Sequence, residues 1–223
     1  EWMTLQSGPV FGFCRVYDRT YPQNGKDPGS PDVGLDAGAS LPLSGPGLAA
    51  GFAMARVAVP LGTFYSTSPA LGTYRAGTYA LTGPGGTQVG PFSASTVFPT
   101  SFTATNWDAL TVVDRTKPLT FNWSGSGFPN IAILVNSAVT SGGQTHITTI
   151  NCNVPGNLGT YSVPVAALAY LSPAATTGSA FGTISLTAQS ETGQFTATLT
   201  GGGSLDMSGF VADQAVVKNI AIQ

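Results

Sequence analysis

The sequence predicts an all-β protein built from two antiparallel β-sandwich modules. Short runs rich in β-branched and aromatic residues recur along the chain, and helical periodicity is nearly absent. The 29 glycines and 16 prolines among 223 residues supply the turns that many short strands need. One short helix is expected over 164–170, where Pro164 suits a first helical turn.

Two modules are expected, an N-terminal β-sandwich over 1–103 and a C-terminal immunoglobulin-like β-sandwich over 104–223. The expected strands of the first are 10–17, 52–59, 78–82 and 92–98, with a long Pro/Gly loop at 21–38. Those of the second are 110–113, 119–123, 131–139, 146–154, 182–188, 194–200 and 215–222. Seven strands in such a length match an immunoglobulin-like sandwich. Residues 191–193 are expected to form a hairpin turn.

Alternation is clearest over 119–123, where every second residue is apolar. Because successive strand side chains point to opposite faces of a sheet, Leu119, Phe121 and Trp123 should share one face. We expect that face to be core.

The charge content excludes several classes of protein. Only 8% of residues are charged, and 8 Lys+Arg against 10 Asp+Glu leave a net charge of −2. This argues against a nucleic-acid partner, because such binders neutralise phosphates with many basic residues. The longest mostly apolar stretch, 48–61, is broken by Arg56 and is shorter than the roughly 20 residues of a membrane-spanning helix, so no transmembrane segment is expected.

No cofactor is expected either. The glycine clusters at 83–86 and 201–203 lack the lysine and the following helix of a phosphate-binding loop. We interpret both clusters as turns.

The two cysteines, Cys14 and Cys152, are too far apart in sequence for a local redox or zinc pair. They predict one long-range disulfide if the compartment is oxidising. The alternative is two separately buried thiols, which behave as small apolar side chains.

Several strand-and-turn motifs together resemble a known group of proteins. They are 35–38, 41–47, 77–79, 82–86, 89–92, 119–125, and Cys152 followed by 159–164. In these motifs the chain resembles uncharacterised exported β-sandwich proteins of soil bacteria. The resemblance implies export and β-sandwich architecture, and it brings no activity and no catalytic residues.

Two groups of residues are candidates for a functional site. Trp107 and Asp108 are possible ligand contacts, because an exposed aromatic ring beside polar groups can hold a sugar, although packing into the seam between modules is the alternative. Asp27, Asp32 and Asp36 form a weak calcium candidate whose spacing does not match an EF-hand, and these acids can equally serve to keep a loop soluble.

Catalytic constellations are not found in the sequence. His146 is the single histidine, it lies in a strand-like run, and no Gly-x-Ser-x-Gly motif accompanies it. The carboxylate pairs of a glycosidase are possible on paper, for example Asp108 with Asp114 or Asp206 with Asp213, but none has a distinctive setting.

The functional expectation is therefore a non-enzymatic protein of structural, adhesive or protein-interaction role with an unknown protein or glycan partner. A carbohydrate-binding module is the alternative, and a carboxylate-pair hydrolase is a lesser one. We expect export to the periplasm, the cell surface or the medium, with any signal already removed, because the chain begins at Glu1 without a leader pattern. Oligomeric state does not follow from the sequence.

Overall fold

The computed structural model describes residues 6–22, 34–59, 62–67, 73–205 and 208–223. Their fold is almost entirely β, as predicted, with mostly antiparallel sheets and one short α-helix. The chain forms two compact units. Unit 1 contains Glu1–Gly29, Phe102–Gln189 and Gln214–Gln223, and unit 2 contains Ser30–Ser101 and Ser190–Asp213.

Unit 1 contains a seven-stranded sheet and a three-stranded sheet. The larger has the order β1 (Gln6–Phe11), β2 (Cys14–Pro22), β12 (Gln144–Pro155), β11 (Asn130–Ser141), β14 (Ala180–Gln189), β17 (Asp213–Ile222) and β9 (Val112–Val113). The smaller has the order β13 (Thr160–Val163), β10 (Leu119–Ser124) and β8 (Thr103–Ala104). Two 3₁₀ turns, η1 (Trp107–Ala109) and η2 (Gly156–Leu158), and the helix α1 (Val165–Leu168) complete the unit. Pro164 precedes the first helical residue, which confirms the predicted helix.

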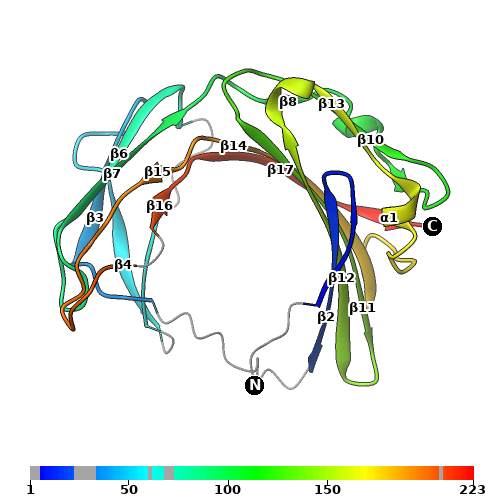
Figure 1. The fold of residues 1–223 in the computed structure, drawn as a ribbon, viewed down its shortest axis with the longest axis horizontal. Coiled ribbons are helices and arrows are strands. Elements are labelled where there is room, and N and C mark those ends of the chain that lie inside the picture. The colour runs from blue at the N-terminus through cyan, green and yellow to red at the C-terminus, as the bar shows by residue number, and fades with distance from the viewer. Residues whose placement is uncertain (1–5, 23–33, 60–61, 68–72, 206–207) are drawn as a thin grey trace. The chain divides into compact units, whose positions relative to one another are not determined.

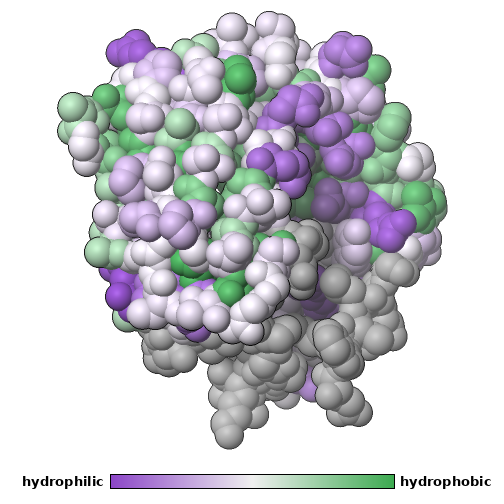
Figure 2. All heavy atoms as spheres, turned by 60° about the vertical axis from the view of Figure 1, so that its left-hand side comes forward, coloured by the Kyte–Doolittle hydropathy of each residue, from purple (hydrophilic) through white to green (hydrophobic). Residues whose placement is uncertain are grey.

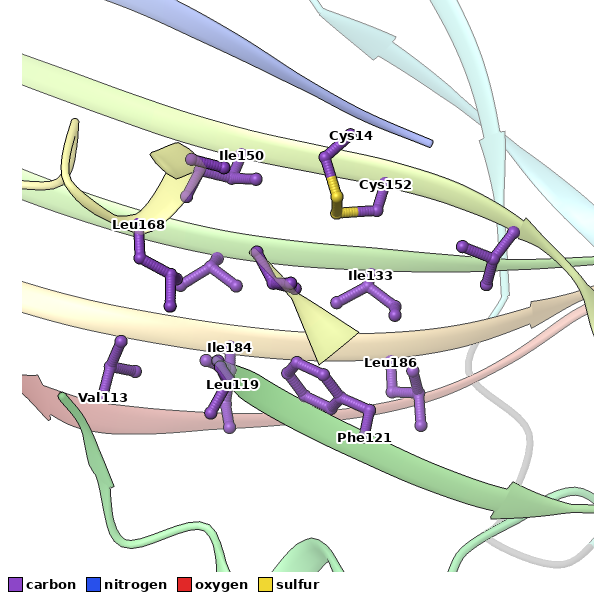
Figure 3. Packing of buried hydrophobic residues seen from close by; sticks show 14 of the residues in the cluster. Cys14, Val113, Leu119, Phe121, Ile133, Ile150, Cys152, Leu168, Ile184 and Leu186 are labelled. Atoms are coloured by element: carbon purple, nitrogen blue, oxygen red, sulfur yellow. A yellow bond between two sulfur atoms is a disulfide. The ribbon is translucent and has the colours of Figure 1, made fainter. Parts of the chain in front are cut away.

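The core of unit 1 lies between these two sheets. Figure 1 shows β8, β10 and β13 on one side of β14 and β17. Leu119, Phe121 and Trp123 are all buried, as the alternation predicted. In Figure 3 the Phe121 ring lies between the side chains of Leu119 and Leu186, so residues from β10 and β14 form one cluster.

A disulfide joins Cys14 on β2 to Cys152 on β12, which confirms the predicted pairing. The two residues lie directly opposite each other in the antiparallel register. Both are fully buried in the core, as Figure 3 shows. The bond therefore ties the N-terminal hairpin to the centre of unit 1 across 138 positions of sequence.

Unit 2 has a five-stranded sheet and a short two-stranded one. The first has the order β5 (Gly62–Ser66), β4 (Ala53–Val59), β3 (Ser40–Ser44), β6 (Gly77–Gly83) and β7 (Phe92–Phe98), and the second pairs β15 (Gly193–Gln194) with β16 (Gly209–Phe210). Among its described residues, one buried apolar cluster consists of small and medium-sized side chains: Ala37, Leu41, Leu43, Leu81, Val89, Ala94 and Ala197.

The strand expected at 10–17 is a hairpin in the structure. Gly12, with φ 61°, allows the turn between β1 and β2, a conformation that glycine adopts without strain. Because β2 then pairs with β12, the N-terminal strands belong to unit 1. Contacts thus divide the chain near the expected seam, between Ser101 and Phe102, and at three further places.

The hairpin expected between 182–188 and 194–200 does not form. β14 pairs with β11 along its whole length, and residues 190–213 belong to unit 2. The two ends of segment 190–213 are joined by a hydrogen bond in which the Ser190 amide donates to the Ala212 carbonyl at 3.1 Å. Tertiary pairing therefore overrides the local turn signal at 191–193.

Strongly hydrophilic residues are a minority of the described residues on the face drawn in Figure 2. On the face drawn in Figure 2, pale residues predominate and the hydrophobic residues form small, separate patches. No helix among the described residues is long and apolar enough to cross a membrane.

Candidate functional site

The seven-stranded sheet of unit 1 has one side packed on the core and one side that carries polar and aromatic residues. We call this second side the open face. Its residues are Arg15, Tyr17, Arg19, Tyr21, Leu134, Asn136, Ile147, Thr149 and Asn151. Their neighbours along each strand, such as Val16 and Ile150, are fully buried, which places the open-face residues on the opposite side.

The register aligns these side chains in rows that cross the strands. Tyr17 lies opposite Thr149, which lies opposite Asn136. The Asn136 amide Nδ2 donates to the Thr183 hydroxyl at 3.2 Å, so the row continues onto β14. The next row begins with Arg15 and Asn151. Hydrogen-bonding groups from four strands thus line up across the face.

A shallow hollow of about 500 Å³ lies in the open face. Tyr17 and Tyr21 line it from β2, and both are partly buried. Arg19, which lies between them on the same face, donates from Nη1 to the Tyr21 hydroxyl at 3.2 Å. The hollow therefore combines aromatic rings, amides and a guanidinium, which suits a polar ligand that also has apolar surface.

Trp107 and Asp108, the predicted ligand contacts, lie in η1. Asn106 fixes this turn to β10, because its Nδ2 donates to the Thr120 carbonyl and its Oδ1 accepts from the Asn122 amide, both at 2.9 Å. Asp108 is exposed and Trp107 is partly buried against the core cluster of unit 1. The Nζ of Lys218 lies 5.0 Å from the centroid of the Trp107 ring, so a cation already occupies one of its faces.

The calcium candidate is described only at Asp36, since Asp27 and Asp32 lie outside the described residues. The Asp36 carboxylate is buried and accepts hydrogen bonds from the Thr87 hydroxyl at 2.8 Å and the Gly38 amide at 3.0 Å. Arg56 forms an ion pair with it at 3.5 Å. These partners, led by the Thr87 hydroxyl, hold the pKa of Asp36 below its ordinary value. Asp36 therefore braces a loop, and the described residues contain no cluster of three or more potential metal ligands of the His, Cys, Asp and Glu types.

A tyrosine and a glycine complete the surroundings of Asp36. The Tyr65 hydroxyl donates to the Gly38 carbonyl at 2.7 Å and accepts from the Ala37 amide at 2.8 Å. Gly86 approaches so closely that a Cβ there would stand 2.7 Å from Oδ1 of Asp36. Hydrogen bonds of Tyr65 and the close approach of Gly86 thus hold the loop around Asp36 in place.

The groups considered for catalysis are held in other ways. His146 lies on β12 with its Nε2 3.8 Å from Asp18 Oδ1, and both side chains are about half exposed. Asp114 accepts from the Thr116 hydroxyl at 2.6 Å and pairs with Lys117 at 2.9 Å, which lowers its pKa to about 2. Asp206 lies outside the described residues, so its pairing with Asp213 is not described.

Unit 2 has a smaller aromatic hollow of about 250 Å³. Tyr74, Tyr79 and Phe98 line it with their rings 5.6–6.3 Å apart. The Tyr79 hydroxyl lies within hydrogen-bonding distance of the Pro46 and Arg75 carbonyls and accepts from the Arg75 amide, so this ring has a structural role. Asp213 stands at the edge of the hollow, and burial raises its pKa.

No protein-family model, curated protein or solved structure matches this chain.

The sequence contains a signal for the open face that the strand assignment missed. Arg15, Tyr17, Arg19 and Tyr21 alternate with Val16, Asp18 and Thr20, a period of two that indicates a strand continuing past residue 17. Ending the expected strand at Tyr17 hid this pattern. The partner residues on β11 and β12 follow only from the register.

Proposed function

We propose that this chain is a non-enzymatic, exported adhesive protein that binds carbohydrate through the open face of unit 1. The observation that carries the proposal is the hollow where Tyr17 and Tyr21 meet the amide and hydroxyl groups of Asn136, Thr149 and Asn151. Sugar rings have apolar C–H faces that pack on aromatic rings and hydroxyls that pair with amides. A shallow, open hollow suits an extended chain of sugars.

The β1 edge of the larger sheet is poorly suited to strand addition by a partner protein, which favours the face of the sheet as the binding surface. β1 is the edge strand on one side, and it contains Pro9 and a break in register between Ser7 and Val10. On the other side, β9 is two residues long and pairs with β17 at Ala221 and Ile222. Proline and irregular pairing protect the β1 edge from pairing with another chain.

Export is supported by the disulfide. Cross-links of this kind persist in oxidising compartments and are rare in a reducing cytosol. The buried position of Cys14 and Cys152 in the core makes the bond part of the folded structure of unit 1. A module that folds with this bond and contacts glycans at its surface suits the periplasm, the cell surface or the medium.

The test is retention of the full chain in affinity gels that contain neutral and acidic soluble polysaccharides. We expect at least one polysaccharide to retard the protein, and Tyr17→Ala to weaken that interaction by about threefold to tenfold. Tyr170→Ala is the matched control, because Tyr170 is exposed in the same unit and lies outside the open face. Trp107→Ala reports on the predicted ligand contact.

Three results would contradict the proposal. The first is no retardation by any polysaccharide of the panel. The second is a loss caused by Trp107→Ala and none by Tyr17→Ala, which would move the site to η1. The third is binding of a protein partner that is unchanged in the Tyr17→Ala variant, which would favour the protein-interaction role.

A further inference from the structure

The described cationic side chains of unit 1 fall into two groups. Three contact a backbone carbonyl or a carboxylate of the unit. The Arg115 Nη1 donates to the Leu171 carbonyl at 2.9 Å, Lys117 pairs with Asp114 at 2.9 Å, and the Lys218 Nζ donates to the Trp107 carbonyl at 2.5 Å. The other two described cations, Arg15 and Arg19, are exposed and lie on the open face.

Neither Arg15 nor Arg19 has an acidic partner among the described residues. The acid nearest to them in sequence, Asp18, is on β2 between Tyr17 and Arg19, so its side chain points to the opposite face, where it meets His146. The open-face residues as defined above include two arginines and no Asp or Glu. In a protein with only 8% charged residues, this face carries a local excess of positive charge.

The arginines alternate with the tyrosines along one strand. Residues on one face of a strand repeat about every 7 Å, so Arg15 and Arg19 are about 13 Å apart with Tyr17 between them. A guanidinium binds a carboxylate through two parallel hydrogen bonds. A polymer with an anionic group at regular intervals and a flat apolar surface between them would meet both residue types in turn.

From this arrangement we infer that the ligand of the open face is an acidic polysaccharide with a carboxylate on its sugar rings, a polyuronate. The inference rests on the proposed carbohydrate function and specifies its substrate class. The tyrosines contact the ring faces, Arg15 and Arg19 bind carboxylates, and Asn136, Thr149 and Asn151 bind ring hydroxyls. Single-stranded nucleic acid, which also combines anions with flat rings, is the competing occupant, and it is disfavoured because only two cations are available for its phosphates.

The test compares hexagalacturonate with its fully methyl-esterified form by isothermal titration of the full chain at low salt. We expect hexagalacturonate to bind more tightly than the ester, and the double variant R15Q/R19Q to weaken the binding of hexagalacturonate at least about tenfold, a larger loss than it causes for the ester. Arg75→Gln is the matched control, because Arg75 is an exposed arginine of unit 2. Raising the salt concentration should weaken binding of the acid and not of the ester.

The outcomes separate this inference from the proposed function. Equal binding of acid and ester, unchanged in R15Q/R19Q and lost in Tyr17→Ala, would overturn the acidic ligand and leave the carbohydrate function in place. If neither hexagalacturonate nor its ester binds, and no neutral polysaccharide retards the protein, both the acidic ligand and the carbohydrate function are overturned. Tighter binding of oligouridylate than of hexagalacturonate would also overturn the inference. A circular dichroism spectrum matching that of the parent chain would show that each variant is folded.

Discussion

Unit 1 and unit 2 are stabilised in different ways, although both are built from antiparallel strands. Unit 1 has a core of large side chains that includes Phe121, Ile133 and Leu186 with no exposed surface, and a buried disulfide crosses it. The apolar cluster among the described residues of unit 2 has fewer and smaller side chains, and the polar contacts of Asp36 and Tyr65 lie in the same unit. The comparison shows how the same fold class uses apolar burial in one unit and hydrogen-bonded bracing in the other.

The largest expected effect comes from the core of unit 1. Phe121→Ala should destabilise the protein by about 3–5 kcal/mol, because it leaves a cavity in a close-packed cluster. Chemical denaturation measures the free energy of unfolding, and amide hydrogen exchange locates the loss in the strands of unit 1. Val217→Ala is the control, since Val217 is 64% exposed and should change stability by less than about 0.5 kcal/mol. A loss below about 1 kcal/mol for Phe121→Ala would show that the core packing is wrongly assigned.

Loss of the disulfide should have the next largest effect. The double variant C14A/C152A is expected to lose about 2–5 kcal/mol, because the bond restricts the unfolded chain over a span of 138 residues. Exchange should rise in β2 and β12 first. Mass spectrometry of the unreduced protein after alkylation provides the direct check. Two alkylated thiols in the folded protein would contradict the bond.

A smaller effect is expected from the bracing in unit 2. Tyr65→Phe should cost about 1–3 kcal/mol, because the Ala37 amide and the Gly38 carbonyl both lose a partner. Hydrogen exchange should increase in unit 2 and stay unchanged in unit 1. Tyr170→Phe is the control, as Tyr170 is about half exposed. Equal free energies of unfolding for Tyr65→Phe and Tyr170→Phe would contradict the stabilising role of the Tyr65 hydrogen bonds in unit 2.

The smallest effect concerns the pH dependence of a surface turn in unit 1. The Thr116 hydroxyl, followed by Lys117, lowers the pKa of Asp114 from 3.8 to about 2. A carboxyl with a lowered pKa in the folded state adds stability at pH values above its unfolded pKa, and this contribution is lost as the pH falls through about 2. NMR titration of the Asp114 carboxyl carbon should give a midpoint near 2. A midpoint near 3.8 would mean that the turn does not hold the carboxylate.

Local patterns in the sequence predicted the parts of the fold that depend on neighbouring residues. The alternation at 119–123 identified three core residues, and Pro164 marked the helix start. The sequence places residues 190–213 with the C-terminal module, whereas their contacts group them with unit 2, because a hairpin signal at 191–193 carries no information about distant strands. Which unit receives this segment depends on contacts such as the Thr96 hydroxyl with Ser190.

The candidate site shows the same division between local and distant information. The Arg and Tyr alternation on β2 is visible in the sequence, but its partners on β11 and β12 come from positions more than 100 residues away. Trp107 was singled out because aromatic residues beside acids are a familiar sugar-binding pattern. Its cation contact with Lys218 depends on two segments that are 111 positions apart.

The most direct test of the proposed binding surface is an NMR titration of the isotope-labelled full chain with cellohexaose and, separately, with hexagalacturonate. We expect at least one probe to shift the amide signals of Tyr17, Thr149 and Asn136 together and to reach saturation, with hexagalacturonate giving the larger shifts at Arg15 and Arg19. Shifts confined to η1 or to unit 2, or no shifts with either probe, would contradict the proposed binding surface.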